Sequence, residues 1–331
     1  MLTLGIETSC DETAAALVRD GVHLVASRVA TQVEVHRVYG GVVPEVASRH
    51  HLERLDPLVE ALLAEAGVGL RSVDAVAVTR GPGLVGALMV GVSYAKALAF
   101  AIGRPLVGVN HVLAHVYAAF LAEGRLPSFP TLALVVSGGH TDLILLESPT
   151  AATVLGRSRD DAAGEAFDKV ARAIGLPYPG GPRLEALAAE GERGKVVLPD
   201  VRPFPNSLDF SFSGIKTAAA RLLEAGARPA DVALAFQEKV VELLARGLEE
   251  ACRKVPAPTL VLAGGVAANR RLRARVAEVA ASFQRELLVP PAWLCTDNAA
   301  MVAAMGHYLV TAGVRDGWDL GATAVIHPFK P

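Results

Sequence analysis

Two histidines, His111 and His115, stand four residues apart in an apolar stretch that we expect to be helical. This spacing places both imidazoles on one face of a helix, which suits two ligands of one divalent metal. Val112 follows the first histidine, so the pattern lacks the glutamate base of zinc peptidases. Histidine pairs at this spacing are more often ordinary core or surface residues, and a metal site needs a third ligand. Asp297 is the best candidate, although an acid at the start of an apolar helix is also an ordinary N-cap.

Two polar turns between strand-like runs could bind phosphate. Residues 137–141 (SGGHT) carry little side-chain bulk, so their backbone N–H groups could face an anion. Residues 8–13 (TSCDET) have a similar setting, but Asp11 and Glu12 would repel phosphate unless a metal intervenes. A plain hairpin turn is an equally good interpretation of either segment.

Two further segments could contact a nucleotide. Gly264 and Gly265 follow a buried strand and precede a helix, a context in which a nucleotide can approach the backbone, although a tight turn is the simpler interpretation. Asp161, Glu165 and Asp168 would share one helical face. One of these carboxylates could grip a ribose, whereas a solvated face needs no ligand at all.

The elements that must position these residues follow a repeated pattern. A strand, a polar turn and a second strand span residues 2–19, and the same arrangement returns at 131–147. Strand-like runs alternate with Ala/Leu-rich helical runs, so the sequence predicts an α/β fold with two duplicated lobes around a nucleotide cleft. We expect an N-terminal lobe of residues 1–108, completed by 308–331, and a C-terminal lobe of 109–307.

Length and composition limit the class of protein. The 331 residues are 52% hydrophobic, which suffices for two cores, and a net charge of −2 gives no bulk attraction to nucleic acid. Three widely spaced cysteines argue for a reducing cytosol, and no signal peptide is recognisable. The apolar stretch 84–103 contains Ser93, Lys96 and several glycines, so we expect a buried helix and a cytoplasmic protein without a membrane span.

In this order, the segments resemble the TsaD family of tRNA N6-adenosine threonylcarbamoyltransferases, formerly described as O-sialoglycoprotein endopeptidases. The resemblance runs from about residue 2 to about residue 310. Besides the histidine pair, it rests on GIETSCDET (5–13), YGGVVPEVASR (39–49), GPGLVG (81–86), VSGGHT (136–141), DDAAGEAFDK (160–169), YPGGP (178–182), DFSFSG (209–214), AGGV (263–266) with Asn269, and CTDN (295–298).

The resemblance implies a fold and a reaction. The fold would be the two-lobed actin/Hsp70/sugar-kinase (ASKHA) architecture. The reaction would transfer a threonylcarbamoyl group from threonylcarbamoyl-adenylate to the N6 amine of adenosine 37, in tRNAs that read codons starting with A, and release AMP. The implied partners are a TsaB-like paralogue and a TsaE-like ATPase.

The resemblance also implies site residues. The residues that match the family's metal site, which holds iron(II) or zinc, are His111, His115 and Asp297. Those that match its adenylate pocket are Val135, Val136, Ser137, Gly138, Gly139, Asp168, Gly181, Glu185 and Asn269.

The proposed chemistry needs a base, because an exocyclic adenine amine is a poor nucleophile. An adenylate is already activated, so the enzyme has to orient it, polarise it and exclude water. Asp11 and Glu12, at the tip of the first hairpin, are the acids we would test first. A metallopeptidase and a kinase-like ATPase or scaffold remain as alternatives.

A tRNA substrate would have to meet a local basic surface. One candidate is the arginine run at 270–275, for which an ion-paired surface is the simpler interpretation. The better candidate is segment 36–54, which includes Arg49 and Arg54 beside the turn-forming Gly40 and Gly41.

Overall fold

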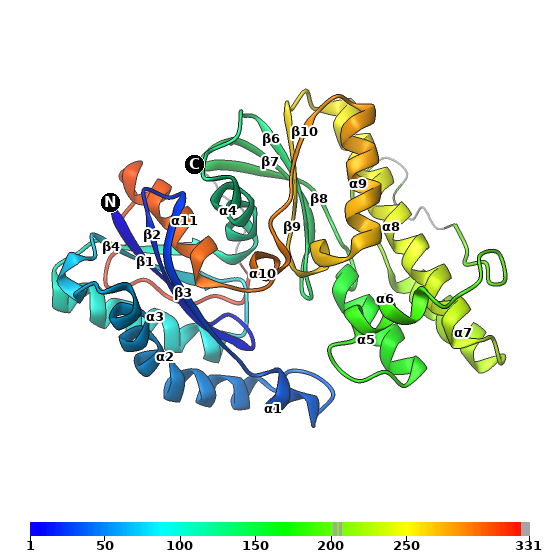
Figure 1. Ribbon diagram of the computed structural model, residues 1–331, viewed down its shortest axis with the longest axis horizontal. Coiled ribbons are helices and arrows are strands. Elements are labelled where there is room, and N and C mark those ends of the chain that lie inside the picture. Colours follow the sequence, from blue (N-terminus) through cyan, green and yellow to red (C-terminus); the bar gives the residue numbers. More distant parts are fainter. Residues whose placement is uncertain (201–203, 205–206, 326–331) are drawn as a thin grey trace. The chain divides into compact units, whose positions relative to one another are not determined.

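The computed structural model describes residues 1–200, 204 and 207–325 (Figure 1). The chain divides into two compact units. Unit 1 consists of Met1–Pro127, Glu147–Ala152 and Thr296–Pro331, and unit 2 consists of Ser128–Leu146 and Thr153–Cys295.

Unit 1 is built on a five-stranded sheet with the order β3-β2-β1-β4-β5. β1 is antiparallel to β2, and β4 runs parallel to both β1 and β5. The central strands β1 and β4 are buried along almost their whole length because helices cover both faces of the sheet. The strands are β1 (Leu2–Glu7), β2 (Glu12–Arg19), β3 (His23–Thr31), β4 (Ala75–Gly81) and β5 (Leu106–Asn110).

Helices α2 and α3 cover one face of this sheet, where Leu4 and Ile6 share a core with Leu55 and Val92. Alternate residues of β1 point to the other face, along which α11 packs. The helices of unit 1 are α1 (Val33–Arg37), α2 (Pro44–Ala66), α3 (Val85–Ile102), α4 (His111–Glu123) and α11 (Ala299–Thr311), with the 3-10 turn η1 (Leu70–Ser72).

Unit 2 repeats the topology of unit 1. Its sheet has the order β10-β9-β6-β7-β8, with β7 antiparallel to β6 and both β6 and β10 parallel to β9. Read from the hairpin outward, the strand order is the same as in unit 1, which agrees with the predicted duplication. The strands are β6 (Thr131–Val136), β7 (Thr141–Ser148), β8 (Ala151–Arg157), β9 (Thr259–Ala263) and β10 (Glu286–Leu288).

The helices of unit 2 enclose a core that includes Phe167, Phe212 and Phe236. Figure 1 shows α8 and α9 side by side along this unit. The helices are α5 (Ala163–Ile174), α6 (Gly180–Ala188), α7 (Ser213–Glu224), α8 (Pro229–Lys254), α9 (Arg270–Ser282) and α10 (Ala292–Cys295), with the 3-10 turn η2 (Gly265–Ala268).

The units do not follow the expected lobe boundaries at residues 108 and 307. Helices α4 and α11 pack against each other and against the first sheet, so both belong to unit 1. Of the C-terminal segment that we expected to complete the first lobe, residues 326–331 lie outside the described part of the chain.

Helix α3 is the one described helix that is long and apolar enough to cross a membrane. It packs on β4 and α2, and Leu88, Val92 and Ala95 are buried there. It is therefore a core helix of unit 1, as the sequence predicts.

Helix α11 can approach the sheet because two glycines remove side chains at the contact. A Cβ on Gly5 would lie 2.2 Å from the carbonyl oxygen of Ala299, and a Cβ on Gly306 would lie 2.3 Å from the Cβ of Ala77. Non-bonded atoms do not come this close. Helix α11 can therefore lie at this distance from the sheet only because residues 5 and 306 lack side chains.

We predict that Gly5→Ala lowers the free energy of unfolding by about 2–3 kcal/mol, because α11 must move away from β1. Gly69→Ala is the matched control, since Gly69 has a φ of −75° and a Cβ there meets nothing within 4 Å. Urea denaturation of the three proteins measures the difference. Equal losses in the two variants would show that the close approach of α11 does not limit stability.

Candidate functional site

Helix α4 begins directly at the end of β5. The side-chain oxygen of Asn110 accepts hydrogen bonds from the backbone N–H groups of Val112 and Leu113, at 3.0 and 3.2 Å, and so caps the helix. His111 is therefore the first helical residue and His115 lies one turn later, on the same face. Both side chains are buried.

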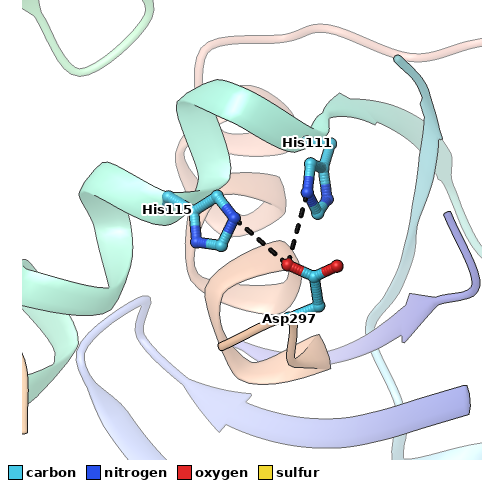
Figure 2. A group of neighbouring side chains, drawn as sticks. All are labelled: His111, His115 and Asp297. Carbon is cyan, nitrogen blue, oxygen red and sulfur yellow. Dashed lines mark ion pairs between the residues drawn. The ribbon is translucent and has the colours of Figure 1, made fainter. Parts of the chain in front are cut away.

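Asp297 lies just before α11 and does not cap it. The cap is Asn298, whose side-chain oxygen accepts from the N–H of Met301 at 3.0 Å. One carboxylate oxygen of Asp297, Oδ1, lies 3.4 Å from Nε2 of His111 and 3.3 Å from Nε2 of His115 (Figure 2). The ligand atoms of the three residues all lie within 4.8 Å of one another, so the group could hold a metal ion.

The unsatisfied nitrogens of His115 support this interpretation. The side chain is only 1% exposed, and neither ring nitrogen makes a hydrogen bond in the described part of the chain. Its contact with Asp297 has the distance of an ion pair but not the geometry of a hydrogen bond. Buried polar atoms are rarely left in this way, and a cation bound to Nε2 would satisfy one of them.

Two carboxylates surround His111. Glu7, the last residue of β1, is buried, and its Oε2 lies 3.0 Å from Nδ1 of His111, opposite Asp297. Burial would lower the pKa of His111, but Asp297 and Glu7 outweigh it and hold that pKa well above its usual value. Burial would raise the pKa of Asp297, yet His111 and His115 hold it well below its usual range. The site therefore stabilises positive charge.

Sequence reasoning did not identify Glu7 as part of this site. The available signal was a single acid at the end of an otherwise apolar strand, LTLGIE. Because a buried carboxylate needs donors or a positive charge beside it, such an acid indicates a partner that the sequence alone cannot name.

The predicted catalytic acids lie in the same unit. Oε1 of Glu12 accepts a hydrogen bond from Thr31 Oγ1 at 2.9 Å, whereas its Oε2 is buried without a partner in the described residues. Burial chiefly, with smaller contributions from the charges of Asp11 and Asp297, raises the pKa of Glu12 to about 7, although the hydrogen bond from Thr31 opposes the rise. Burial and Asp297 also raise the pKa of Asp11. These acids are thus electrostatically linked to the histidine–aspartate group.

The residues expected to form the adenylate pocket lie in unit 2. Val135 and Val136 are the buried last residues of β6. The next turn is closed by Ser137, whose Oγ accepts from the N–H of His140 at 3.1 Å. Gly138 and Gly139 are exposed, and a Cβ on either would meet nothing within 4 Å.

A chain of hydrogen bonds links the other expected residues to this turn. The N–H of Gly164 donates to the carbonyl oxygen of Ser137 at 3.2 Å, which places the start of α5 beside the turn. Oδ1 of Asp168 accepts from Gly180 and Gly181 at 2.7 and 3.3 Å. At the start of α9, Glu185 Oε1 accepts from the N–H of Arg270 at 2.9 Å, and Asn269 caps the helix by accepting from Leu272 at 2.9 Å.

Three of the expected substrate-binding side chains therefore hold helix N-termini, namely Asp168 on α6 and Glu185 and Asn269 on α9. This role is structural and was not predicted.

The prediction that Asp161, Glu165 and Asp168 share one helical face is wrong for Asp161. Helix α5 begins at Ala163, so Asp161 lies before the helix. Asp161 and Glu165 instead form ion pairs with Lys169 at 2.6 and 2.8 Å.

The arginine run on α9 is engaged within unit 2. Arg271 pairs with Glu238 at 2.8 Å, and Arg275 pairs with Glu249 at 2.7 Å. Arg49 and Arg54 are exposed on α2. The ion-paired interpretation thus holds for Arg271 and Arg275, whereas Arg270 is exposed and Arg273 donates to the carbonyl oxygens of Ala267 and Pro290.

A family model for TsaD, the tRNA N6-adenosine threonylcarbamoyltransferase, matches residues 23–304. Proteins of that name from Moorella thermoacetica and Geobacillus thermodenitrificans are 53% and 52% identical to this chain. The first alignment covers 92% of this chain and 91% of the relative, and the second covers 96% and 94%.

Solved structures support the fold alone. Full-length HypF in its phosphate- and nucleotide-bound form matches with a TM-score of 0.64 at 14% identity, over 93% of this chain and 55% of HypF. Component A of the Acidaminococcus fermentans (R)-2-hydroxyglutaryl-CoA dehydratase matches with a TM-score of 0.56 at 16% identity, over 94% and 99% of the two chains. Both agree with the expected ASKHA architecture.

The pKa of Glu12 predicts a pH-dependent change in stability. Because its folded-state pKa is raised from 4.5 to about 7, the folded state binds the proton more tightly, and this contribution is lost as the pH rises toward 7. Glu12→Gln should therefore stabilise the protein, by about 1 kcal/mol more at about pH 8 than at about pH 5.5, after allowance for partial exposure. Chemical denaturation of the chelator-treated proteins tests this. An equal difference at both pH values would contradict it.

Proposed function

We propose the following activity for this chain, which belongs to the tRNA N6-adenosine threonylcarbamoyltransferase family. It transfers the threonylcarbamoyl group of threonylcarbamoyl-adenylate to the N6 amine of adenosine 37 in tRNAs that read codons starting with A, and releases AMP. The observation that carries the proposal is family membership over almost the whole chain, and the buried histidine–aspartate group supports it.

The metal in this proposal is iron(II) or zinc, held by His111, His115 and Asp297. Two imidazole nitrogens and one carboxylate oxygen are a usual donor set for either ion and leave coordination positions open for substrate oxygens. When bound, the ion supplies Lewis acidity toward the acyl and phosphoryl oxygens of the adenylate. The protein's own part is to hold three ligand atoms in a buried place that favours positive charge.

Glu12 is the proposed general base, with Asp11 beside it. A carboxylate whose pKa is about 7 can accept a proton from the attacking amine at neutral pH, whereas an ordinary glutamate is a weaker base. The atom that would take this proton is Oε2 of Glu12, which has no hydrogen-bond partner among the described residues.

The turn at Ser137–Gly139 is the proposed site for the adenylate phosphate. The open space over Gly138 and Gly139 would let the phosphate approach the backbone. Val135, Val136 and Gly181 would complete the pocket wall. Asp168, Glu185 and Asn269 act in this proposal by holding the neighbouring helix N-termini, which attract anions.

The proposed partners are tRNA, a TsaB-like paralogue and a TsaE-like ATPase, and the proposed location is the cytoplasm. The exposed Arg49 and Arg54 on α2 remain the better candidates for phosphate contacts of the tRNA, because Arg271 and Arg275 of α9 are engaged with glutamates.

The function is tested by mass spectrometry of tRNA nucleosides after incubation with threonylcarbamoyl-adenylate, alone and with the proposed partners. Wild-type protein should form threonylcarbamoyladenosine, and Asp297→Asn should reduce the rate at least about 100-fold, because it removes a charged ligand. Asp74→Asn is the control, since Asp74 accepts from the N–H of Leu2 at the opposite end of β1, away from the proposed ligands. No modified nucleoside with wild-type protein and partners would reject the proposal.

The adenylate site is tested separately with Gly138→Val. The side chain would fill the open space over the turn, so we expect AMP to bind at least about tenfold more weakly by calorimetry. Gly69→Val, also at an uncrowded glycine, should bind AMP like the wild type. Wild-type affinity in Gly138→Val would exclude this turn as the phosphate site.

A further inference from the structure

We infer that Glu7 is a positioning residue that fixes the tautomer of His111, so that Nδ1 carries the ring proton and Nε2 faces the metal. The inference deepens the function proposed above, because it rests on the proposed metal site. It concerns a residue that does not itself contact the ion.

Glu7 is immobilised by donors from two other parts of unit 1. Its Oε1 accepts a hydrogen bond from the backbone N–H of Ser9 at 2.5 Å, and its Oε2 accepts one from Thr79 Oγ1 at 2.7 Å. The side chain is fully buried. A buried carboxylate is stable only with such partners, so both oxygens are held in place as acceptors.

This carboxylate determines the orientation of the His111 ring. Its Oε2 lies 3.0 Å from Nδ1, and a carboxylate can only accept, so Nδ1 must donate. In the neutral ring, the lone pair is then on Nε2, the atom that faces Asp297 (Figure 2). A carboxylate on the far nitrogen of a metal-binding histidine both fixes the ring and raises its basicity.

The hydroxyl of Ser9 is the other neighbour of Nδ1, at 3.2 Å. A ring N–H bonds more strongly to a charged carboxylate than to a neutral hydroxyl, so Glu7 is the dominant acceptor. Ser9→Ala removes the weaker neighbour and leaves the backbone N–H that holds Glu7. This variant is therefore a matched control.

The two histidines differ in this respect. His115 has no hydrogen bond at its buried Nδ1 within the described residues, so no carboxylate fixes its tautomer. His111 is the ligand that the protein orients in advance, and Glu7 should affect the metal through His111 alone.

Glutamine cannot replace Glu7 in this role. The donors come from two directions, Ser9 on one oxygen and Thr79 with His111 on the other. An amide offers one acceptor oxygen, and its NH2 group would face a donor on the other side. Glu7→Gln therefore loses the acceptor for Nδ1 or the acceptor for Ser9.

The first experiment measures cobalt(II) affinity by competition with a chromophoric chelator, and the d–d spectrum of the bound ion. Glu7→Gln should weaken the affinity about 10- to 100-fold and alter the spectrum. Ser9→Ala should lose clearly less. Equal affinities for wild type and Glu7→Gln, with identical spectra, would overturn the inference.

The second experiment needs no variant of Glu7 and so does not depend on its folding. In zinc-loaded wild-type protein labelled with 15N-histidine, the NMR signals of His111 should show a proton on Nδ1 and a metal-bound Nε2. A proton on Nε2 would overturn the inference even if Glu7→Gln fails to fold. If wild-type protein binds neither ion, the metal site and this inference both fail, whereas the nucleoside assay still decides the transferase activity independently.

Discussion

The placing of two carboxylates, the buried Glu7 and the partly exposed Asp297, around one buried imidazole is the constraint on which unit 1 depends. Glu7 and Asp297 lie on opposite sides of His111, and neither charge could stay in the core without compensation. Four segments of unit 1 must therefore meet at one point, namely the ends of β1 and β4 and the starts of α4 and α11. A group with two buried imidazoles, one buried carboxylate and one partly exposed carboxylate is complementary to a divalent cation, which connects the packing of this unit to its proposed chemistry.

The elements reach this point through small residues and helix caps. Gly5 and Gly306 let α11 lie directly on the sheet, and Asn110 and Asn298 fix where α4 and α11 begin. Unit 2 uses the same topology for a different purpose. The turn of its hairpin carries two glycines where the first hairpin carries acids, and side-chain caps fix the helices around it. The same strand topology thus carries a cluster of charged side chains in unit 1 and an open, glycine-containing turn in unit 2.

Much of this was predictable from the sequence, and the failures have a common cause. The strand–turn–strand repeat predicted the two sheets, and the four-residue spacing predicted one helical face for His111 and His115. Two adjacent residues, Asp297 and Asn298, could each have been the cap of α11, and only tertiary contacts decide which one is. The sequence also could not predict the structural role of Asp168 or the partner of Glu7, because hydrogen bonds between distant segments have no local sequence signal. The boundaries of the compact units differ from the expected lobe boundaries for the same reason, since α4 and α11 are assigned by packing.

Two glutamates of the first hairpin show how the groups around a buried acid set its pKa. Burial would raise the pKa of Glu7, but the charge of His111 and the hydrogen bonds from His111 and Thr79 lower it. Within the described residues, Glu12 has one donor, from Thr31, and a buried oxygen without a partner, so burial prevails and the pKa rises to about 7. Two glutamates five residues apart thus differ in their ionisation: Glu7 stays ionised, whereas Glu12 titrates near neutral pH. In the proposed reaction the substrate is already activated, so Glu7 would only orient a metal ligand and Glu12 would accept the proton of the attacking amine.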